Sequence, residues 1–282
     1  MIEVRNLSYR YEEGGSPVLR GMDLSIQEGE YVILVGPNGC GKTTLIRHFN
    51  ALLRPSVGDV FVDGMNTKDR PVVPEIRQRV GMVFGNPDNQ LVGMTVEEDV
   101  SFGPGNLNLP PREVRTRVAE ALGAVGISRY AKAEPHLLSD GEKQLVALAG
   151  VLAMNPRTIV LDEPTAYLDP SAKARVIEIL LRLHREGLTI VHVTHDPDDM
   201  VYADRVLVMQ EGRVLCDEAP AGILARFRLL KEIGLAVPRV SELMWRLKDM
   251  GLPIDPLVCD VDEACRRIMG LLQARESGEL LG

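Results

Sequence analysis

Short apolar runs alternate with polar and glycine-rich stretches along most of the chain. Several runs are rich in β-branched residues, which predicts strands, and two are apolar throughout, as in strands buried on both faces of a parallel sheet. The predicted strands cover residues 2–4, 24–26, 31–35, 81–84, 158–161 and 188–194. Residues 206–209 and 214–215, separated by a short polar turn, predict a β-hairpin.

A segment with helical periodicity lies between two of these predicted strands. Val176, Ile179, Leu180 and Leu183 share one face of residues 171–185. Strands that alternate with helices are typical of an α/β sheet, and the first strands, which have no helix between them, predict an antiparallel part.

Residues 93–135 lack the strand pattern. Residues 103–105 (Gly-Pro-Gly) and 110–111 (Pro-Pro) are expected to break the chain, and residues 113–122 place Val114, Val118 and Leu122 on one helical stripe. We therefore predict a helical subdomain, spanning about residues 93–150, inserted into the α/β core. The apolar run at residues 145–154 predicts a buried helix within it.

The pattern changes again after Ala219. Two helical stripes follow. The first is formed by Val240, Leu243, Met244, Leu247 and Met250. The second comes after residues 260–263, which resemble a capping box, and is formed by Cys265, Ile268, Met269 and Leu272. Such stripes fit packing on the chain's own core and a dimerisation appendage equally well. We predict a domain boundary near residue 220, with residues 221–282 as a small α-rich C-terminal extension of the dimerisation type.

The amino-acid composition of the chain argues against several classes of function. The formal net charge of −8 argues against broad attraction to nucleic acid or anionic lipid. The four cysteines, at positions 40, 216, 259 and 265, include no CxxC pair and predict neither a disulfide framework nor a zinc site. No apolar run approaches the roughly 18 residues that a bilayer crossing needs. The charged start of the chain does not fit a signal peptide.

The stretch GPNGCGKT at residues 36–43 matches the phosphate-binding P-loop pattern, between a predicted strand and a predicted helix. Its backbone N–H groups and the following helix N-terminus favour phosphate. Lys42 is expected to bridge the β- and γ-phosphates, and the Thr43 hydroxyl to hold Mg²⁺. The nucleotide-contacting residues are predicted to be Gly36, Pro37, Asn38, Gly39, Cys40, Gly41, Lys42, Thr43 and Thr44.

Two carboxylates end the strand at residues 158–161, where an unpaired buried charge would be costly. Asp162 is expected to hold Mg²⁺ through water, and Glu163 to orient or deprotonate the attacking water. His195 ends another buried strand, which places it to contact the γ-phosphate. Tyr11 precedes the P-loop and is predicted to stack on adenine.

The stretch LSDGEKQ at residues 138–144 predicts a helix start. Ser139 and Glu142 have the spacing of a capping box, in which each side chain bonds the other residue's backbone N–H. Taken alone, the motif needs no further function.

The order of these motifs resembles that of ATP-binding cassette (ABC) ATPases, over residues 1 to about 220, with LSDGEKQ similar to their LSGGQ signature. The resemblance implies a P-loop NTPase core with an antiparallel β subdomain and a helical insertion, and an ATPase that uses ATP and Mg²⁺. It also implies head-to-tail pairing of two ATPase domains. Ser139 and Gly141 would then act on the partner's ATP, Asp169 would couple the two sites, and His195 would sense the γ-phosphate.

Residues 84–100 and 234–252 further resemble the ATPase subunits of energy-coupling factor (ECF) transporters, which import vitamins and transition-metal ions such as cobalt and nickel. This resemblance implies a second ATPase subunit, a transmembrane T component and a substrate-binding S component. It places the chain at the cytoplasmic face of the membrane as a peripheral subunit, with no nucleic-acid partner.

The chain departs from the family pattern at two places. Gly85 stands where a Gln usually contacts Mg²⁺ and the attacking water, and Asp140 and Glu142 replace Gly and Gln of the signature. One carboxylate about 7 Å from a phosphate charge costs roughly 2 kcal/mol at an effective dielectric near 20. We therefore favour a heterodimer with a different ATPase over a homodimer, and expect Gln at position 85 to raise turnover if its loss is limiting.

Four other kinds of ABC protein carry similar motifs. The 282-residue chain has no heptads between the P-loop and the signature and carries a single cassette, which excludes DNA-acting and translation-type ABC proteins. A cytosolic scaffold ATPase and the ATPase of a conventional ABC importer remain open, and the C-terminal extension disfavours the latter.

Overall fold

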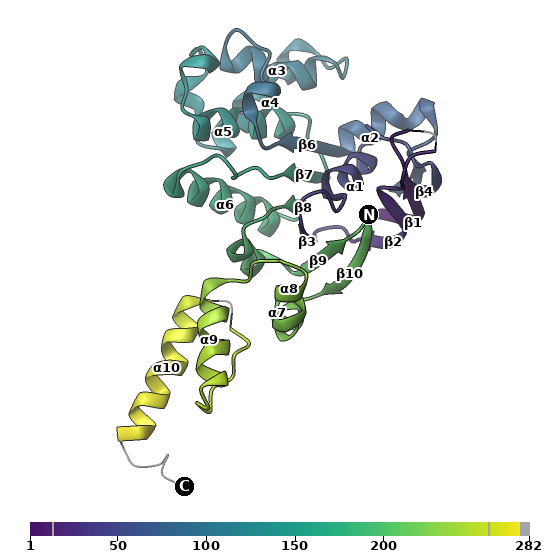
Figure 1. Ribbon diagram of the computed structural model, residues 1–282. Helices are drawn as coiled ribbons and strands as arrows, with labels where there is room; N and C mark the ends of the chain where they lie inside the picture. Colours follow the sequence, from purple (N-terminus) through teal and green to yellow (C-terminus); the bar gives the residue numbers. More distant parts are fainter. Residues whose placement is uncertain (13, 259, 277–282) are drawn as a thin grey trace.

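Two β-sheets form the centre of the protein, whose computed structural model describes residues 1–12, 14–258 and 260–276 (Figure 1). One sheet has the order β2-β1-β4-β5, and its pairings are antiparallel. The other has the order β10-β9-β3-β8-β7-β6, parallel except at β10. The strands are β1 (Ile2–Tyr9), β2 (Leu19–Ile26), β3 (Tyr31–Val35), β4 (Val57–Val62), β5 (Met65–Asn66), β6 (Val80–Phe84), β7 (Thr158–Asp162), β8 (Thr189–Val193), β9 (Arg205–Gln210) and β10 (Arg213–Glu218).

Helices cover both faces of the larger sheet and extend from it at one end of the chain (Figure 1). They are α1 (Lys42–Phe49), α2 (Val73–Arg79), α3 (Val96–Gly105), α4 (Pro111–Ala124), α5 (Asp140–Leu152), α6 (Pro170–Arg185), α7 (Pro220–Ala225), α8 (Phe227–Glu232), α9 (Arg239–Asp249) and α10 (Val261–Glu276). Among the described residues, no helix has both the length and the apolar character needed to cross a membrane.

Two apolar cores hold these layers together. Leu45, Ile46 and Phe49 of α1 are buried between the two sheets. On the other face of the larger sheet, α5 and α6 pack against β3, β7 and β8. The strands of this sheet are therefore buried on both sides, which is why their sequences are continuously apolar. The parallel order also brings the carboxyl ends of β3, β7 and β8 to one edge, where ligands bind in α/β sheets.

The predicted α/β fold is confirmed, with differences in the details. The first two strands are longer than predicted. β4 was missed because Gly58 and Asp59 interrupt its apolar run, and β5 because it has only two residues. The break predicted at residues 103–105 coincides with the end of α3, which includes Pro104 and ends at Gly105. Pro104 lies in the last turn, where its distortion of the helix matters least.

The C-terminal helices α9 and α10 lie side by side and project from the sheets (Figure 1). Met244, Ile254, Val258 and Ala264 form a small core between them. Trp245 stacks on Phe227 of α8, with ring centroids 5.5 Å apart, and so attaches α9 to the rest of the molecule. The predicted helical stripes are confirmed as helices, whereas Cys259 and residues 277–282 lie outside the described residues.

Candidate functional site

The P-loop connects β3 to α1 through residues 36–41. Gly41 has φ +108°, a conformation that side chains disfavour, and it directly precedes the helix. A Cβ at Gly36 would lie 2.4 Å from the carbonyl oxygen of Met209, so the loop can pass β9 this closely only with glycine there. The loop backbone thus curves tightly ahead of a helix N-terminus, which is the geometry of a phosphate cradle.

Lys42 curls back over this loop. Its Nζ donates to the carbonyl oxygens of Gly36 at 2.6 Å and Pro37 at 3.3 Å, and the residue is buried. The amine is therefore held at the centre of the loop, where a bound phosphate would receive its charge. Cys40 is a buried free thiol whose pKa is raised by burial.

Tyr11 lies beside the first turn of α1. Its hydroxyl is 3.0 Å from Oγ1 of Thr44, and its ring meets Tyr9 edge to face at 5.0 Å. Tyr11 is 57% exposed, whereas Tyr9 belongs to β1. Tyr11 thus offers an exposed aromatic face next to the P-loop, which suits stacking with a base.

Thr43 and Asp162 meet at the end of β7. Thr43 Oγ1 donates to Oδ1 of Asp162 at 3.0 Å. Burial raises the pKa of Asp162, and the hydrogen bond from Thr43 opposes this shift. A half-buried carboxylate beside a hydroxyl, facing the phosphate loop, is a pair of hard oxygen ligands of the kind that Mg²⁺ prefers. These two residues therefore fit a magnesium ion bound with nucleotide phosphates.

Glu163 and His195 form a pair next to Asp162. Nδ1 of His195 lies 3.0 Å from Oε2 of Glu163, and both side chains reach solvent. The Glu163 backbone has φ +55°, strained for a non-glycine residue, and its N–H donates to the carbonyl of Val193 at 2.9 Å. Such strain is held in place only by surrounding structure and is concentrated at functional sites. The geometry presents a carboxylate and an imidazole together at the strand ends.

The capping box at the signature is confirmed. Oε2 of Glu142 accepts from the Ser139 N–H at 3.0 Å and from its hydroxyl at 2.8 Å. A hydrogen bond from Tyr130, followed by those from Ser139, lowers the pKa of Glu142, so the carboxylate is ionised at neutral pH. The side chain therefore turns back onto Ser139 and does not point outward. Asp140 is 63% exposed, with Lys143 4.0 Å away.

The start of α5 packs against the start of α6. A Cβ at Gly141 would lie 2.7 Å from that of Ala172, so this approach requires glycine. Asp169 caps α6 by accepting from the N–H groups of Ser171 and Ala172. The predicted site residues thus fall into two groups. One group lies at the starts of α5 and α6 and contains Ser139, Gly141 and Asp169. The other group lies at the ends of the strands and contains Thr43, Asp162, Glu163 and His195.

Gly85 directly follows β6 and lies against the two carboxylate residues. A Cβ here would be 2.7 Å from the carbonyl oxygen of Glu163 and 2.9 Å from that of Asp162. Placing Gln at position 85 therefore requires the backbone to move, which counts against the expected gain in turnover. The side chain of Gln90 accepts from the Phe84 N–H at 3.1 Å and donates to the Met82 carbonyl at 3.3 Å. Gln90 thus bonds to the backbone of edge strand β6.

Sequence reasoning missed three polar contacts near the site. Lys143 forms an ion pair with Asp88 at 2.8 Å, and the amide of Gln144 donates to the Phe84 carbonyl at 3.2 Å. Lys173 of α6 pairs with two carboxylates that follow His195. The only sequence signal for the last contact is a Lys one turn after Asp169, which cannot be distinguished from an ordinary surface residue.

Comparison with known proteins agrees with this geometry. The ABC transporter family profile matches residues 19–166. A cobalt import ATP-binding protein of Syntrophus aciditrophicus is 52% identical over 95% of this chain and 96% of its own length. An energy-coupling factor transporter ATP-binding protein of Caldanaerobacter subterraneus is 47% identical over 93% of this chain and 96% of its own.

Solved structures show the same likeness. The structure of cbiO1 from Clostridium perfringens, part of the ABC transporter complex cbiONQ, has a TM-score of 0.75 at 40% identity and covers 86% of this chain and 98% of its own. A dimeric ATP-binding cassette, MJ0796, bound to ADP and phosphate, has a TM-score of 0.70 at 31% identity, covering 78% of this chain and 98% of its own. This chain therefore belongs to the ABC transporter family, among the ATP-binding subunits of energy-coupling factor transporters.

Proposed function

We propose that this chain is the ATP-hydrolysing subunit of an importer for a transition-metal ion of the cobalt–nickel class. The observation that carries the proposal is the 52% identity, over nearly the whole chain, to a protein named for cobalt import. Vitamin uptake is the alternative substrate class, because other relatives are named only as energy-coupling factor ATPases.

The site supports a direct hydrolysis. Glu163 takes a proton from water, whose oxygen attacks the γ-phosphorus while the bond to the β-phosphate oxygen breaks, giving ADP and phosphate. His195, 3.0 Å from Glu163, orients the carboxylate and contacts the γ-phosphate. Lys42 and the P-loop amides bind the phosphates, and Tyr11 stacks on adenine. Thr43 and Asp162 would hold Mg²⁺, which supplies charge neutralisation when bound.

A second ATPase subunit completes the site in this proposal. Ser139 and Gly141 at the start of α5 would contact the partner's γ-phosphate, and Asp169 would link the two sites. Residues 221–282 would serve as a dimerisation extension beside the ATPase domain of residues 1–220. In support, the outer faces of α9 and α10 expose several large apolar side chains, namely Leu243, Met250, Val261, Met269 and Leu272.

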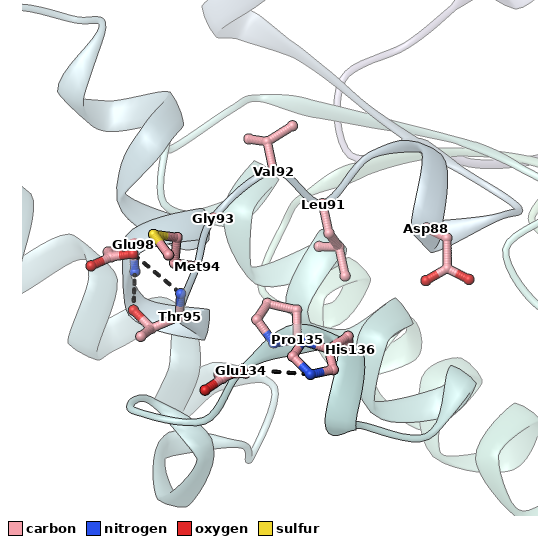
Figure 2. A pocket seen from close by; sticks show the side chains of 10 residues that line it. All are labelled: Asp88, Leu91, Val92, Gly93, Met94, Thr95, Glu98, Glu134, Pro135 and His136. Atoms are coloured by element: carbon pink, nitrogen blue, oxygen red, sulfur yellow. Dashed lines mark hydrogen bonds and ion pairs between the residues drawn. The ribbon is translucent and has the colours of Figure 1, made fainter.

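A pocket between η2 (Pro87–Asn89), the start of α3 and η4 (Pro135–Leu137) is the proposed docking place for the transmembrane T component, which holds the S component. It has a volume of about 670 Å³. Leu91 points toward Pro135 and His136, while Val92 points away (Figure 2). Val92 is 69% and Met94 81% exposed, so two large apolar side chains lie at the surface among the residues that line this pocket. Docking there would place the chain at the cytoplasmic face of the membrane.

The proposal predicts that the chain is recovered with membranes together with integral membrane partners. Met94→Asp is expected to abolish this recovery, because it places a charge on the exposed apolar rim. Leu52→Asp is the matched control, since it places the same charge on an exposed apolar side chain that lies outside both the pocket and the α9–α10 extension. The measurement is quantitative co-purification in detergent. Recovery without any membrane protein would instead support a cytosolic scaffold ATPase.

A further inference from the structure

The loop that carries His195 is organised by its neighbours. The His195 side chain contacts Glu163 and is 58% exposed, so little else restrains the ring itself. Thr194 Oγ1 donates to Oδ2 of Asp199 at 2.7 Å, and the Asp196 N–H donates to Thr194 Oγ1 at 3.0 Å. Both neighbours of His195 in the chain therefore belong to one hydrogen-bonded network.

An ammonium group from a different element holds this network. Nζ of Lys173, on α6, lies 2.5 Å from Oδ2 of Asp196 and 2.7 Å from Oδ1 of Asp199. Asp199 is fully buried, and a buried carboxylate without a partner is strongly destabilising. Burial lowers the pKa of Lys173, but the hydrogen bonds to the two carboxylates outweigh burial and leave it raised. The amine is therefore charged and fixed.

Lys173 also reaches the catalytic pair from the side of α6. It lines a cavity of about 190 Å³ together with Glu163, Thr165 and His195. The helix that carries it begins at Pro170, directly after its cap Asp169. A displacement of the Asp169 loop would thus be passed through the first turn of α6 to the loop that carries His195.

We propose that Lys173 is a positioning residue for ATP hydrolysis, which ties the His195 loop to α6 and so holds the imidazole against Glu163. The inference rests on the function proposed above for Glu163 and His195. It concerns orientation, because Lys173 is bonded to Asp196 and Asp199 rather than to the P-loop.

The test compares Lys173→Met with Lys173→Arg in the intact transporter. The Met variant is expected to lower kcat for ATP by about tenfold or more while KM changes less than about twofold, since the nucleotide contacts lie elsewhere. The Arg variant keeps the charge and is expected to restore most of the rate. Arg182→Met, which removes an ion pair with Glu186 and a hydrogen bond to the Ala124 carbonyl near the other end of α6, is the matched control. Equal loss in the Met and Arg variants would overturn the proposal.

A second variant distinguishes loss of positioning from loss of folding in Lys173→Met. Asp196→Asn weakens one Lys173 contact and leaves the buried Asp199 paired, so it is expected to lower kcat in the same direction by a smaller factor. The imidazole NMR signal of His195, assigned with His195→Ala, should shift in Lys173→Met and Asp196→Asn, while that of His48 in α1 stays in place. An unmoved His195 signal in both variants would also overturn the proposal.

A double variant distinguishes failure of this inference from failure of the function on which it rests. In a His195→Ala background, Lys173→Met is expected to lower the residual turnover by less than about twofold. An undiminished loss there would mean that Lys173 acts independently of His195. If His195→Ala alone leaves turnover unchanged, the role proposed for His195 fails.

Discussion

Replacing Glu163 with Gln is expected to lower ATP turnover by roughly 10²- to 10⁴-fold while ATP binding is retained. The amide has the same shape as the carboxylate and can still contact His195, which lies 3.0 Å away. It cannot accept a proton from the attacking water. The Lys42 and Thr43 contacts lie on other elements and do not change. Phosphate release measures the first effect, and equilibrium binding of ATP the second.

Glu211 offers the matched control for this variant. It is also a glutamate with positive φ, at +47°, but it lies in the turn between β9 and β10. Glu211→Gln therefore reproduces the change in charge and local backbone without touching the strand ends. Turnover in Glu163→Gln within about threefold of that in Glu211→Gln would exclude Glu163 as the general base, given the expected range.

Replacing both signature carboxylates, Asp140→Gly with Glu142→Gln, is expected to strengthen ATP-dependent pairing of the ATPase subunits. Glu142 is ionised and occupies the Ser139 hydroxyl and N–H, the donors that a partner's γ-phosphate would otherwise take. Relief of roughly 2 kcal/mol for each charge corresponds to about a 30-fold tighter association per carboxylate. Analytical ultracentrifugation with ATP and the hydrolysis-deficient subunit measures the effect.

The control for the signature variant comes from a second capping box in the same subdomain. Glu98 pairs with Thr95 at the start of α3 as Glu142 pairs with Ser139 at the start of α5. Glu98→Gln removes the same charge at the same position of a capping box but faces no proposed phosphate. If Glu98→Gln changes the association of the ATPase subunits as much as the signature variant does, the effect is one of general electrostatics. The proposed contact of the signature with the partner's ATP would then be unsupported.

The sequence predicted the fold where local pattern and tertiary packing agree. The strands β3, β6, β7 and β8 were found because burial on both faces makes them continuously apolar. The positions of Glu163 and His195 at the ends of β7 and β8 then followed, whereas the 3.0 Å contact between their side chains comes from the structure. By contrast, the sequence analysis did not identify α3 itself; it predicted only the break at residues 103–105, where this helix ends with Pro104 in its last turn.

Contacts between polar side chains that lie far apart along the chain could not be predicted from the sequence. Lys173 meets Asp196 and Asp199 only because α6 packs beside the loop after β8. The turn of Glu142 onto Ser139 depends on its rotamer and on Tyr130, which comes from a separate segment. The clash that a side chain at Gly85 would meet arises from the pairing of β6 with β7. Each of these results depends on packing, which the order of residues does not reveal.

ATP-driven uptake of ⁵⁷Co²⁺ into vesicles tests the central claim most directly. Vesicles that contain the transporter assembled with this chain should accumulate the ion only when ATP is present on the side of the ATPase subunits. The same assembly with Glu163→Gln should bind ATP without accumulating the ion. Uptake that persists without ATP, or that is unchanged in Glu163→Gln vesicles, would contradict the account.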